Sequence, residues 1–374
     1  MQYTEYELGE LLPFEQPTAY IVKSTDYSDA YATPVLTAGK SFILGKTNET
    51  DGIFDQLPVI IFDDFTTATQ FVNFRFKVKS SAMKILHINT DLVIPKYIFY
   101  RLQIIQFDHG THKRYWIQSY SKIKVLIPPL DEQFRIVARI EELFSELDKA
   151  VDTLKTTKEQ LEVYRQAVLK DAFSDFEKKD SIRNLTMVVT SGSRGWAKYY
   201  SNSGALFVRI GNLTHSGIDI DFRDIQHITP PDNAEGVRTK LQPNDVLVSI
   251  TADLGSIGFV SEKVEEAYIN QHIALVRFQN PVQGRFMAWY LRSEYGQKDL
   301  LKNKRGGGKL GLGLDDIRDT PVPIVDDITA TEIVDKVEEQ LSVCDSIEKT
   351  VDTVLAQADA MRQSILKQAF EGTM

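Results

Sequence analysis

The chain is poor in cysteine and contains no long apolar run. Cys344 is the one cysteine among 374 residues, which excludes an internal disulfide framework and is typical of a reducing compartment. No segment approaches the ~18–20 consecutive apolar residues of a membrane-spanning helix. No basic stretch followed by an apolar one opens the sequence, so no secretory signal is predicted. These absences predict a cytoplasmic protein without a membrane partner.

Catalytic motifs are scarce as well. The glycine cluster at 305–313 lacks the Gly-Lys-Ser/Thr ending of a phosphate-binding loop, and no Asn-Pro-Pro-Tyr or Asp-Pro-Pro-Tyr run marks an amino-methyltransferase. His109 and His112 lack the cysteine and carboxylate neighbours that zinc prefers. The pair Asp63-Asp64 is more typical of a turn at a strand end than of a nuclease site. We therefore predict no catalytic residue, no metal and no cofactor bound by this chain.

A duplicated segment organises the chain. Residues 165–173 are RQAVLKDAF and residues 362–370 are RQSILKQAF, an offset of 197 positions. At the same offset, Asp148 matches Asp345 upstream of the two runs. Self-similarity at a fixed offset predicts two copies of one structural element.

Each copy has the pattern of a long amphipathic helix. Apolar residues alternate at spacings of three and four over ~40 residues, which predicts a coiled-coil seam. The predicted seam comprises Ile140, Leu147, Leu154, Leu161, Arg165, Val168, Leu341, Val351, Leu355, Arg362 and Ile365. Lys158 and Glu348 also fall on the seam, which allows ion pairs between the two helices. The alternative is that each helix packs on its own domain or on another subunit.

The simplest arrangement pairs the two helices antiparallel, which would place the two globular halves at opposite ends of a rod, related by a pseudo-twofold axis. We predict an α+β fold with mixed α/β domains at 1–130 and 180–325, and spacer helices at 131–179 and 326–374. Within the two globular halves, the predicted strands are 58–62, 71–78, 122–127, 205–210, 246–250 and 273–278, and the predicted helices are 95–106 and 284–296.

Charge is segregated along the sequence, although the net charge of the whole chain is −9. Residues 65–130 contain ten basic side chains and only two acids, and residues 181–218 contain no acid. The helical segments are acidic, with net charges of −4 over 131–180 and −7 over 326–374. Cationic stretches within the globular halves and acidic helices predict that an anionic partner binds these stretches.

Three loops combine cations with aromatic or glycine residues, as DNA-contacting loops often do. The predicted contacts are His112, Lys113, Arg114 and Tyr115 in the first half, and Ser193, Arg194, Trp196, Lys198, Tyr199, Lys304, Arg305 and Lys309 in the second. The alternative for any one of these loops is an ordinary solvated turn.

Several segments resemble one protein family. Residues 127–133 (IPPLDEQ), 135–144 (RIVARIEELF) and 165–170 (RQAVLK) look like the conserved helix of type I restriction–modification specificity subunits. Residues 33–40 (TPVLTAGK), 79–84 (KSSAMK) and 112–116 (HKRYW) resemble one class of target-recognition domain, and residues 207–213 (FVRIGNL) resemble another. The start of the second helix departs from the pattern, because 323–327 (PIVDD) lacks the Pro-Leu-x-Glu-Gln run.

The resemblance implies a non-catalytic subunit that reads a split, asymmetric site in double-stranded DNA, one half with each target-recognition domain. It adds Lys79, Ser80 and Lys84 to the expected DNA contacts. It also implies that the helices bind two modification subunits, which carry S-adenosylmethionine and methylate adenine, and that restriction subunits can join them. Two alternatives are a DNA-binding coiled-coil scaffold without sequence specificity and an enzyme fused to recognition domains.

Overall fold

The computed structural model describes residues 3–37, 41–108, 114–177, 179–232, 234–302, 304 and 310–372. The chain divides into two compact units. Unit 1 combines residues 1–154 with 353–374, and unit 2 comprises residues 155–352. Each unit therefore contains one globular head together with parts of both long helices. We call the globular parts head 1 (3–129) and head 2 (179–326). The predicted domain limits remain predictions.

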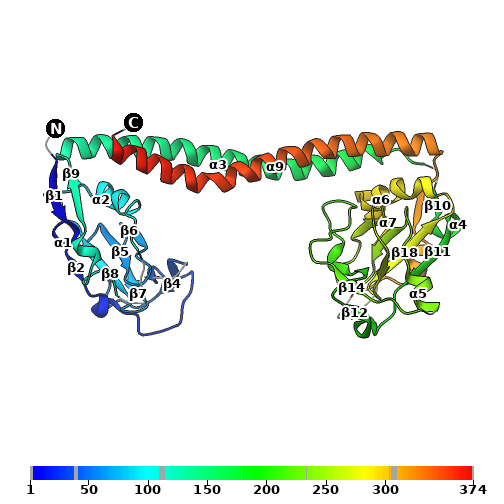
Figure 1. Cartoon of the computed structure of the whole chain (residues 1–374), viewed down its shortest axis with the longest axis horizontal. Helices are drawn as coiled ribbons and strands as arrows, with labels where there is room; N and C mark the ends of the chain where they lie inside the picture. Colours follow the sequence, from blue (N-terminus) through cyan, green and yellow to red (C-terminus); the bar gives the residue numbers. More distant parts are fainter. Residues whose placement is uncertain are drawn as a thin grey trace. The chain divides into compact units, whose positions relative to one another are not determined.

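Head 1 is built on a four-stranded sheet with a smaller sheet beside it (Figure 1). The larger sheet has the order β2 (Phe14–Glu15), β8 (Met83–His87), β5 (Val59–Asp63) and β6 (Thr69–Val72), and the smaller one has the order β4 (Ile43–Thr47), β3 (Thr33–Leu36) and β7 (Lys77–Val78). A third ladder pairs β1 (Thr4–Glu7) with β9 (Lys124–Ile127). The helical elements are α1 (Leu8–Leu11), η1 (Pro17–Tyr20), α2 (Pro95–Leu102) and η2 (Tyr120–Lys122).

Head 2 repeats this plan with two four-stranded sheets and a short ladder. The sheets have the orders β11 (Thr186–Ser191), β18 (Ile273–Phe278), β15 (Val246–Ser249), β16 (Ile257–Phe259), and β12 (Tyr200–Ser201), β14 (Gln226–Ile228), β13 (Ala205–Val208), β17 (Ala267–Ile269). The ladder pairs β10 (Lys179–Ser181) with β19 (Pro321–Pro323). The helical elements are α4 (Ile182–Leu185), η3 (Trp196–Tyr199), η4 (Ile210–Asn212), α5 (Ala234–Thr239), η5 (Pro281–Gln283), α6 (Gly284–Arg292), α7 (Glu294–Leu300) and α8 (Leu314–Arg318).

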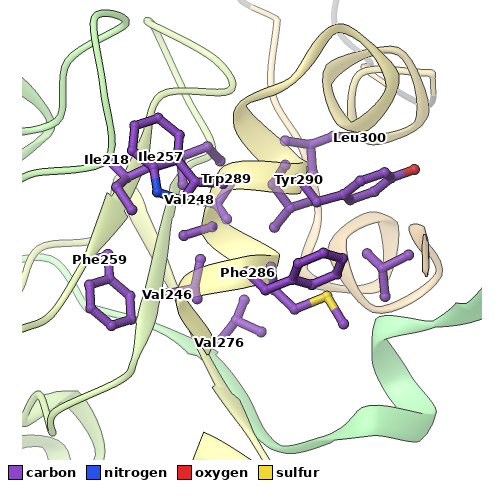
Figure 2. Packing of buried hydrophobic residues seen from close by; sticks show 14 of the residues in the cluster. Ile218, Val246, Val248, Ile257, Phe259, Val276, Phe286, Trp289, Tyr290 and Leu300 are labelled. Carbon is purple, nitrogen blue, oxygen red and sulfur yellow. The ribbon is translucent and has the colours of Figure 1, made fainter. Parts of the chain in front are cut away.

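The core of head 2 forms where α6 covers the sheet that contains β15 and β18. Val246 and Val276 face each other in the antiparallel ladder and are fully buried. Figure 2 shows Phe286, Trp289 and Tyr290 of α6 among these sheet residues. Apolar side chains that alternate along strands and recur along a helix bury one continuous core in this way.

The duplicated segments form two long helices, α3 (Leu130–Ala172) and α9 (Asp327–Glu371). In unit 1, Ile140 near the start of α3 packs with Leu366 and Ala369 near the end of α9. In unit 2, Val168 near the end of α3 shares a core cluster with Val337 near the start of α9. The helices therefore run antiparallel, and the predicted pairing is confirmed (Figure 1).

Every residue of the predicted seam is buried or half-buried. Cys344 also lies along this seam and its exposed fraction is 1%. The ion pairs allowed by the sequence form within unit 2, where the Lys158 Nζ lies 3.4 Å from the Glu348 Oε1. Arg165 binds Asp345 and Glu348 at 2.7 and 2.9 Å. Polar groups inside an apolar seam select the pairing register, because a shift would leave them unpaired.

The same ion pair recurs in unit 1, where Arg362 binds Asp148. Arg362 and Asp148 are the repeat partners of Arg165 and Asp345. Helix α3 supplies the arginine in unit 2 and the aspartate in unit 1, and α9 does the reverse. The duplication therefore extends from the sequence to the contacts between the helices.

The two long helices begin differently, as the departure in the sequence suggested. At the start of α3, the buried Gln133 accepts from Ile94 N and donates to the carbonyls of Leu92 and Pro128. Its repeat partner is Ala330, which has no side-chain amide. At the start of α9, head 2 supplies the amide instead, because the Gln283 Nε2 donates to Val325 O at 2.9 Å.

None of the helices within the described residues is long and apolar enough to cross a membrane.

Candidate nucleic-acid interface

In head 1, two of the predicted contact segments converge on Asp64. Its backbone N donates to Ala82 O, next to the turn of Lys79 and Ser80, and its backbone O accepts from Tyr115 N at 3.0 Å. Lys79, Ser80 and Arg114 have exposed side chains. The structure therefore brings these two segments to the same residue, and the exposed Lys79 and Arg114 carry the charge that binds phosphate.

Two predicted contacts of head 1 are corrected by the structure. Lys84 is 1% exposed and its Nζ lies 3.3 Å from the Oδ2 of Asp64, which is 2% exposed. Tyr115 is buried beside Phe107 in the head 1 core. Neither side chain can reach DNA in this conformation. Both instead hold the loop in place, because Asp64 Oδ1 also accepts from the backbone N of Trp116 at 2.9 Å.

In head 2, the loop 191–199 lies against the segment that follows β17. A Cβ atom added at Gly192 would lie 2.4 Å from the carbonyl oxygen of Ile269, so only glycine allows this approach. Arg194 and Lys198 are exposed, and Ser193 and Tyr199 are half-buried. Ser193 is fixed by Arg238, whose Nη2 donates to its Oγ at 2.7 Å.

Trp196, a predicted contact in this loop, is a core residue instead. It is 3% exposed, stacks on Phe207 with 5.1 Å between ring centroids, and donates from Nε1 to Glu235 Oε1 at 2.6 Å. The prediction of a DNA contact is therefore wrong for Trp196 in this conformation. Its role is to anchor the loop that presents Arg194 and Lys198.

Head 2 also has a cavity of about 640 Å³, lined by Arg209, Ile210, Gly211, Asn212, Asp221, Arg223, Asp224 and Asn270. The buried Asn212 shapes it by accepting from Arg209 N and donating to the carbonyls of Asp221 and Asp224. Arg223 is 89% exposed, yet two of its nitrogens bind Asp221. Hydrogen bonds from Arg223 lower the pKa of Asp221 to about 2, so this carboxylate keeps its charge and holds the guanidinium in place.

The segment 270–272 joins the loops of head 2. Asn270 lines the cavity and contacts the Gly192 loop. His272 Nδ1 is hydrogen-bonded to Thr251 Oγ1, and its Nε2 lies 2.8 Å from Gln271 Nε2. Thr251 in turn bridges to Gly311, at the end of the predicted 304–309 contact loop. Lys304 in that loop is exposed. Segment 270–272 therefore contacts the Gly192 loop and Thr251, and Thr251 links it to Gly311.

Sequence reasoning missed Gln271 and Arg223 as candidate contacts, and Asn270, which is 8% exposed, as a residue that lines the cavity beside them. Asparagine and glutamine amides match the donor and acceptor pattern of adenine in the major groove, and arginine matches guanine. An Asn-Gln-His run carries no charge signal, and only contacts distant in sequence reveal its position. Four predicted contacts, His112, Lys113, Arg305 and Lys309, lie outside the described residues.

One polar cluster in head 2 has the composition of a hydrolytic triad but a different geometry. His215 Nε2 lies 2.7 Å from Asp253 Oδ1 and 3.1 Å from Ser256 Oγ. A catalytic histidine uses one ring nitrogen for the acid and the other for the nucleophile. Here both partners share one nitrogen and Ser256 is fully buried, so the cluster fixes a turn. No group of three or more metal-binding side chains occurs in the described part of the chain.

No protein-family model matches the chain. Among curated proteins, it is 46% identical over 174 residues to the specificity subunit of the type I restriction enzymes EcoR124I and EcoR124II from Escherichia coli, covering 43% of each chain. It is 28% identical over 301 residues to the StySPI specificity subunit from Salmonella potsdam, covering 74% of this chain and 63% of that protein. The chain thus spans less than two thirds of these relatives.

Solved structures extend the similarity of fold to almost the whole chain. A chain from a type I restriction–modification system, solved in a study of complex assembly and conformational transition, superposes with a TM-score of 0.71. Its sequence identity is 16%, and the match covers 98% of this chain and 97% of that one. The HsdS subunit of Thermoanaerobacter tengcongensis gives a TM-score of 0.60 at 16% identity, covering 100% and 97%.

Two α/β heads carried on an antiparallel helix pair are therefore the fold of an HsdS specificity subunit. The resemblance seen in the sequence is confirmed: the chain is a relative of the specificity subunits of type I restriction–modification systems.

Proposed function

We propose that this chain is the non-catalytic DNA-specificity subunit of a cytoplasmic type I restriction–modification complex. Its relationship to named specificity subunits carries the proposal. In each head, exposed basic side chains lie on loops that buried residues hold in place, and head 2 adds the half-buried amide of Gln271. These are the groups that bind phosphates and read base edges. Each head would read one half of a bipartite, asymmetric site in double-stranded DNA.

The expected partners are two modification subunits that bind the helices, and restriction subunits that join them. S-adenosylmethionine would bind the modification subunits, which methylate adenine. The acidic surfaces of α3 and α9 support this division of roles, because acidic helices repel DNA and suit a protein partner.

Methylation mapping tests the proposal. The full chain would be produced together with its modification subunits in a host without adenine methylation, and methylated adenines would be sequenced across the genome. We expect one bipartite, asymmetric motif. Methylation that ignores sequence, or that does not require this chain, would refute the proposal.

A variant series in the same assay tests the site. We expect the double change Asn270→Ala and Gln271→Ala to relax one half of the motif and leave the other half intact. The matched control is Gln279→Ala, an exposed amide at the far end of β18. Equal relaxation of both halves by the double variant would exclude the proposed role of 270–272.

A further inference from the structure

One of the contacts between head 1 and the long helices is a carboxylate that receives two donors. Lys96 on α2 forms an ion pair with Glu141 Oε1 of α3. Tyr100, one helical turn later, donates from its hydroxyl to the same oxygen at 3.5 Å. Residues four apart lie on the same helix face, so both groups reach Glu141 together. Burial and the charge of Glu141 raise the pKa of Tyr100 to about 12, so the phenol keeps the proton that it donates.

Head 2 contacts the long helices in the same way, with different residues. Arg285 on α6 forms an ion pair with Glu338 Oε1 of α9. Trp289, again four residues later, donates from Nε1 to the same oxygen at 2.8 Å. Glu141 and Glu338 are repeat partners at the offset of 197. Two helices of unlike sequence therefore place a cation and an aromatic donor on the same repeat residue.

An aromatic contact accompanies each carboxylate. Tyr97, next to Lys96, packs edge-on against Phe370 with ring centroids 5.2 Å apart. Phe286, next to Arg285, packs edge-on against Phe173 at 5.5 Å. Phe173 and Phe370 are also repeat partners; Phe370 lies on α9 and Phe173 directly follows α3, so each belongs to the repeat copy that does not supply the glutamate. Each head therefore contacts both helices of its unit.

The two kinds of contact constrain a head differently. Apolar burial is strong but has little directionality, so the aromatic packing beside each glutamate does not by itself fix the rotation of a head on the helix pair. A carboxylate that receives two donors from one helix face fixes direction as well as distance. We propose that Glu141 and Glu338 are positioning residues that fix the rotation of each head on the helix pair. If the proposed function holds, this rotation sets how each head presents its loops to a half-site.

The exposure of these ion pairs separates positioning from simple stabilisation. Lys96 and Glu141 are 47% and 39% exposed, and Arg285 and Glu338 are 42% and 29% exposed. Ion pairs this open to solvent contribute little to folding free energy. Removing the carboxylate should therefore change orientation much more than stability.

Pulsed electron paramagnetic resonance on the full chain tests the proposal without DNA. Nitroxides would be attached at Met187→Cys in head 2 and Ser346→Cys on α9, both exposed, in a Cys344→Ala background. We expect a narrow distance distribution for the parent. We expect Glu338→Ala to shift or at least double its width, while the midpoint of thermal unfolding moves by no more than about 2–4 °C. Glu338→Gln keeps an oxygen that can accept from both Arg285 and Trp289, so it should retain most of the parent width.

Arg285→Lys is the matched conservative control, because head 1 uses lysine at the equivalent position. It should leave the distribution unchanged. An unchanged distribution in Glu338→Ala would overturn the proposal, as would an equal broadening in Glu338→Gln. Because no DNA is present, either result stands apart from the methylation assay that tests the proposed function.

Discussion

Lys79 and Lys84 lie five residues apart in head 1, and the structure gives their amines opposite surroundings. Lys79 is exposed, and its Nζ lies 5.9 Å from the ring centroid of Tyr27. Lys84 is enclosed with Asp64, which also accepts from the backbone of Trp116. A buried charge that loses its partner is costly, whereas an exposed one is not. Changing Lys84 should therefore affect stability, whereas changing Lys79 should affect the proposed DNA binding and leave stability almost unchanged.

We predict that Lys84→Met lowers the free energy of unfolding by roughly 3–5 kcal/mol, because it leaves Asp64 buried and unpaired. Urea unfolding followed by tryptophan fluorescence would measure the loss. Lys79→Met is the matched control, with an expected change below about 0.5 kcal/mol. Equal stability of the two variants would contradict the role assigned to Lys84.

A second residue-scale prediction concerns Asp253. The hydrogen bond from His215 lowers the pKa of this carboxyl. Since the folded pKa is depressed, the carboxylate stabilises head 2 above its unfolded pKa of about 4, and this contribution disappears as the pH falls through the lower folded value. We predict that His215→Ala raises the pKa of Asp253 towards its ordinary value, measured by carbon NMR of the carboxyl. His227→Ala, distant in sequence, should leave it unchanged.

At the scale of elements, the antiparallel seam combines apolar packing with a few enclosed charges. Val351 is 4% exposed, while Val343, about two turns earlier on α9, is 56% exposed. Arg165 is 12% exposed and keeps its charge beside Asp345 and Glu348. The seam therefore tolerates polar groups only where a partner from the other helix meets them.

We predict that Val351→Asp weakens the helix pair by roughly 2–4 kcal/mol, because its carboxylate would enter the seam without a partner. Circular dichroism at 222 nm during denaturation would report the loss. Val343→Asp, the same change on the exposed face of the same helix, should have little effect. If both variants unfold at the same midpoint, Val351 does not lie in a seam between the two helices.

The double change Leu154→Asp and Leu161→Asp should abolish assembly with the modification subunits.

Periodicity and duplication made the long helices predictable, because both signals are local or repeat at a fixed offset. The strands at 59–63, 246–249 and 273–278 and the helices at 95–102 and 284–292 also fell within or close to predicted runs. The burial of individual side chains was harder to predict from the sequence. Lys84 lies in a cationic sequence, yet its partner Asp64 stands twenty positions earlier. The contacts of 270–272 with the Gly192 loop and with Thr251 likewise join distant segments, which no local pattern encodes.

At the scale of the whole molecule, each unit has its own core, although both long helices continue from one unit into the other. In head 2, Asp245 is fully buried and receives two hydrogen bonds from Arg277, both at 2.7 Å. Damage to this pair should open the core of unit 2 and leave the core of unit 1 closed.

We predict that Asp245→Ala reduces hydrogen-exchange protection of β15 and β18 by at least tenfold, and that it leaves β5 and β8 of head 1 within twofold of the parent. Exchange measured by mass spectrometry on peptides from each head would resolve the two responses. Lys84→Met should give the reverse pattern. A uniform loss of protection in both heads would show that the chain unfolds as one cooperative body.

Because Cys344 is buried, the reactivity of its thiol reports on the separation of α3 and α9. Burial raises the pKa of its thiol, so the group is both shielded and protonated while α3 and α9 are in contact. Because the chain has no other cysteine, the rate of alkylation by a maleimide measures how often this part of the coiled coil opens. An assembled complex and an isolated subunit could then be compared with no introduced label.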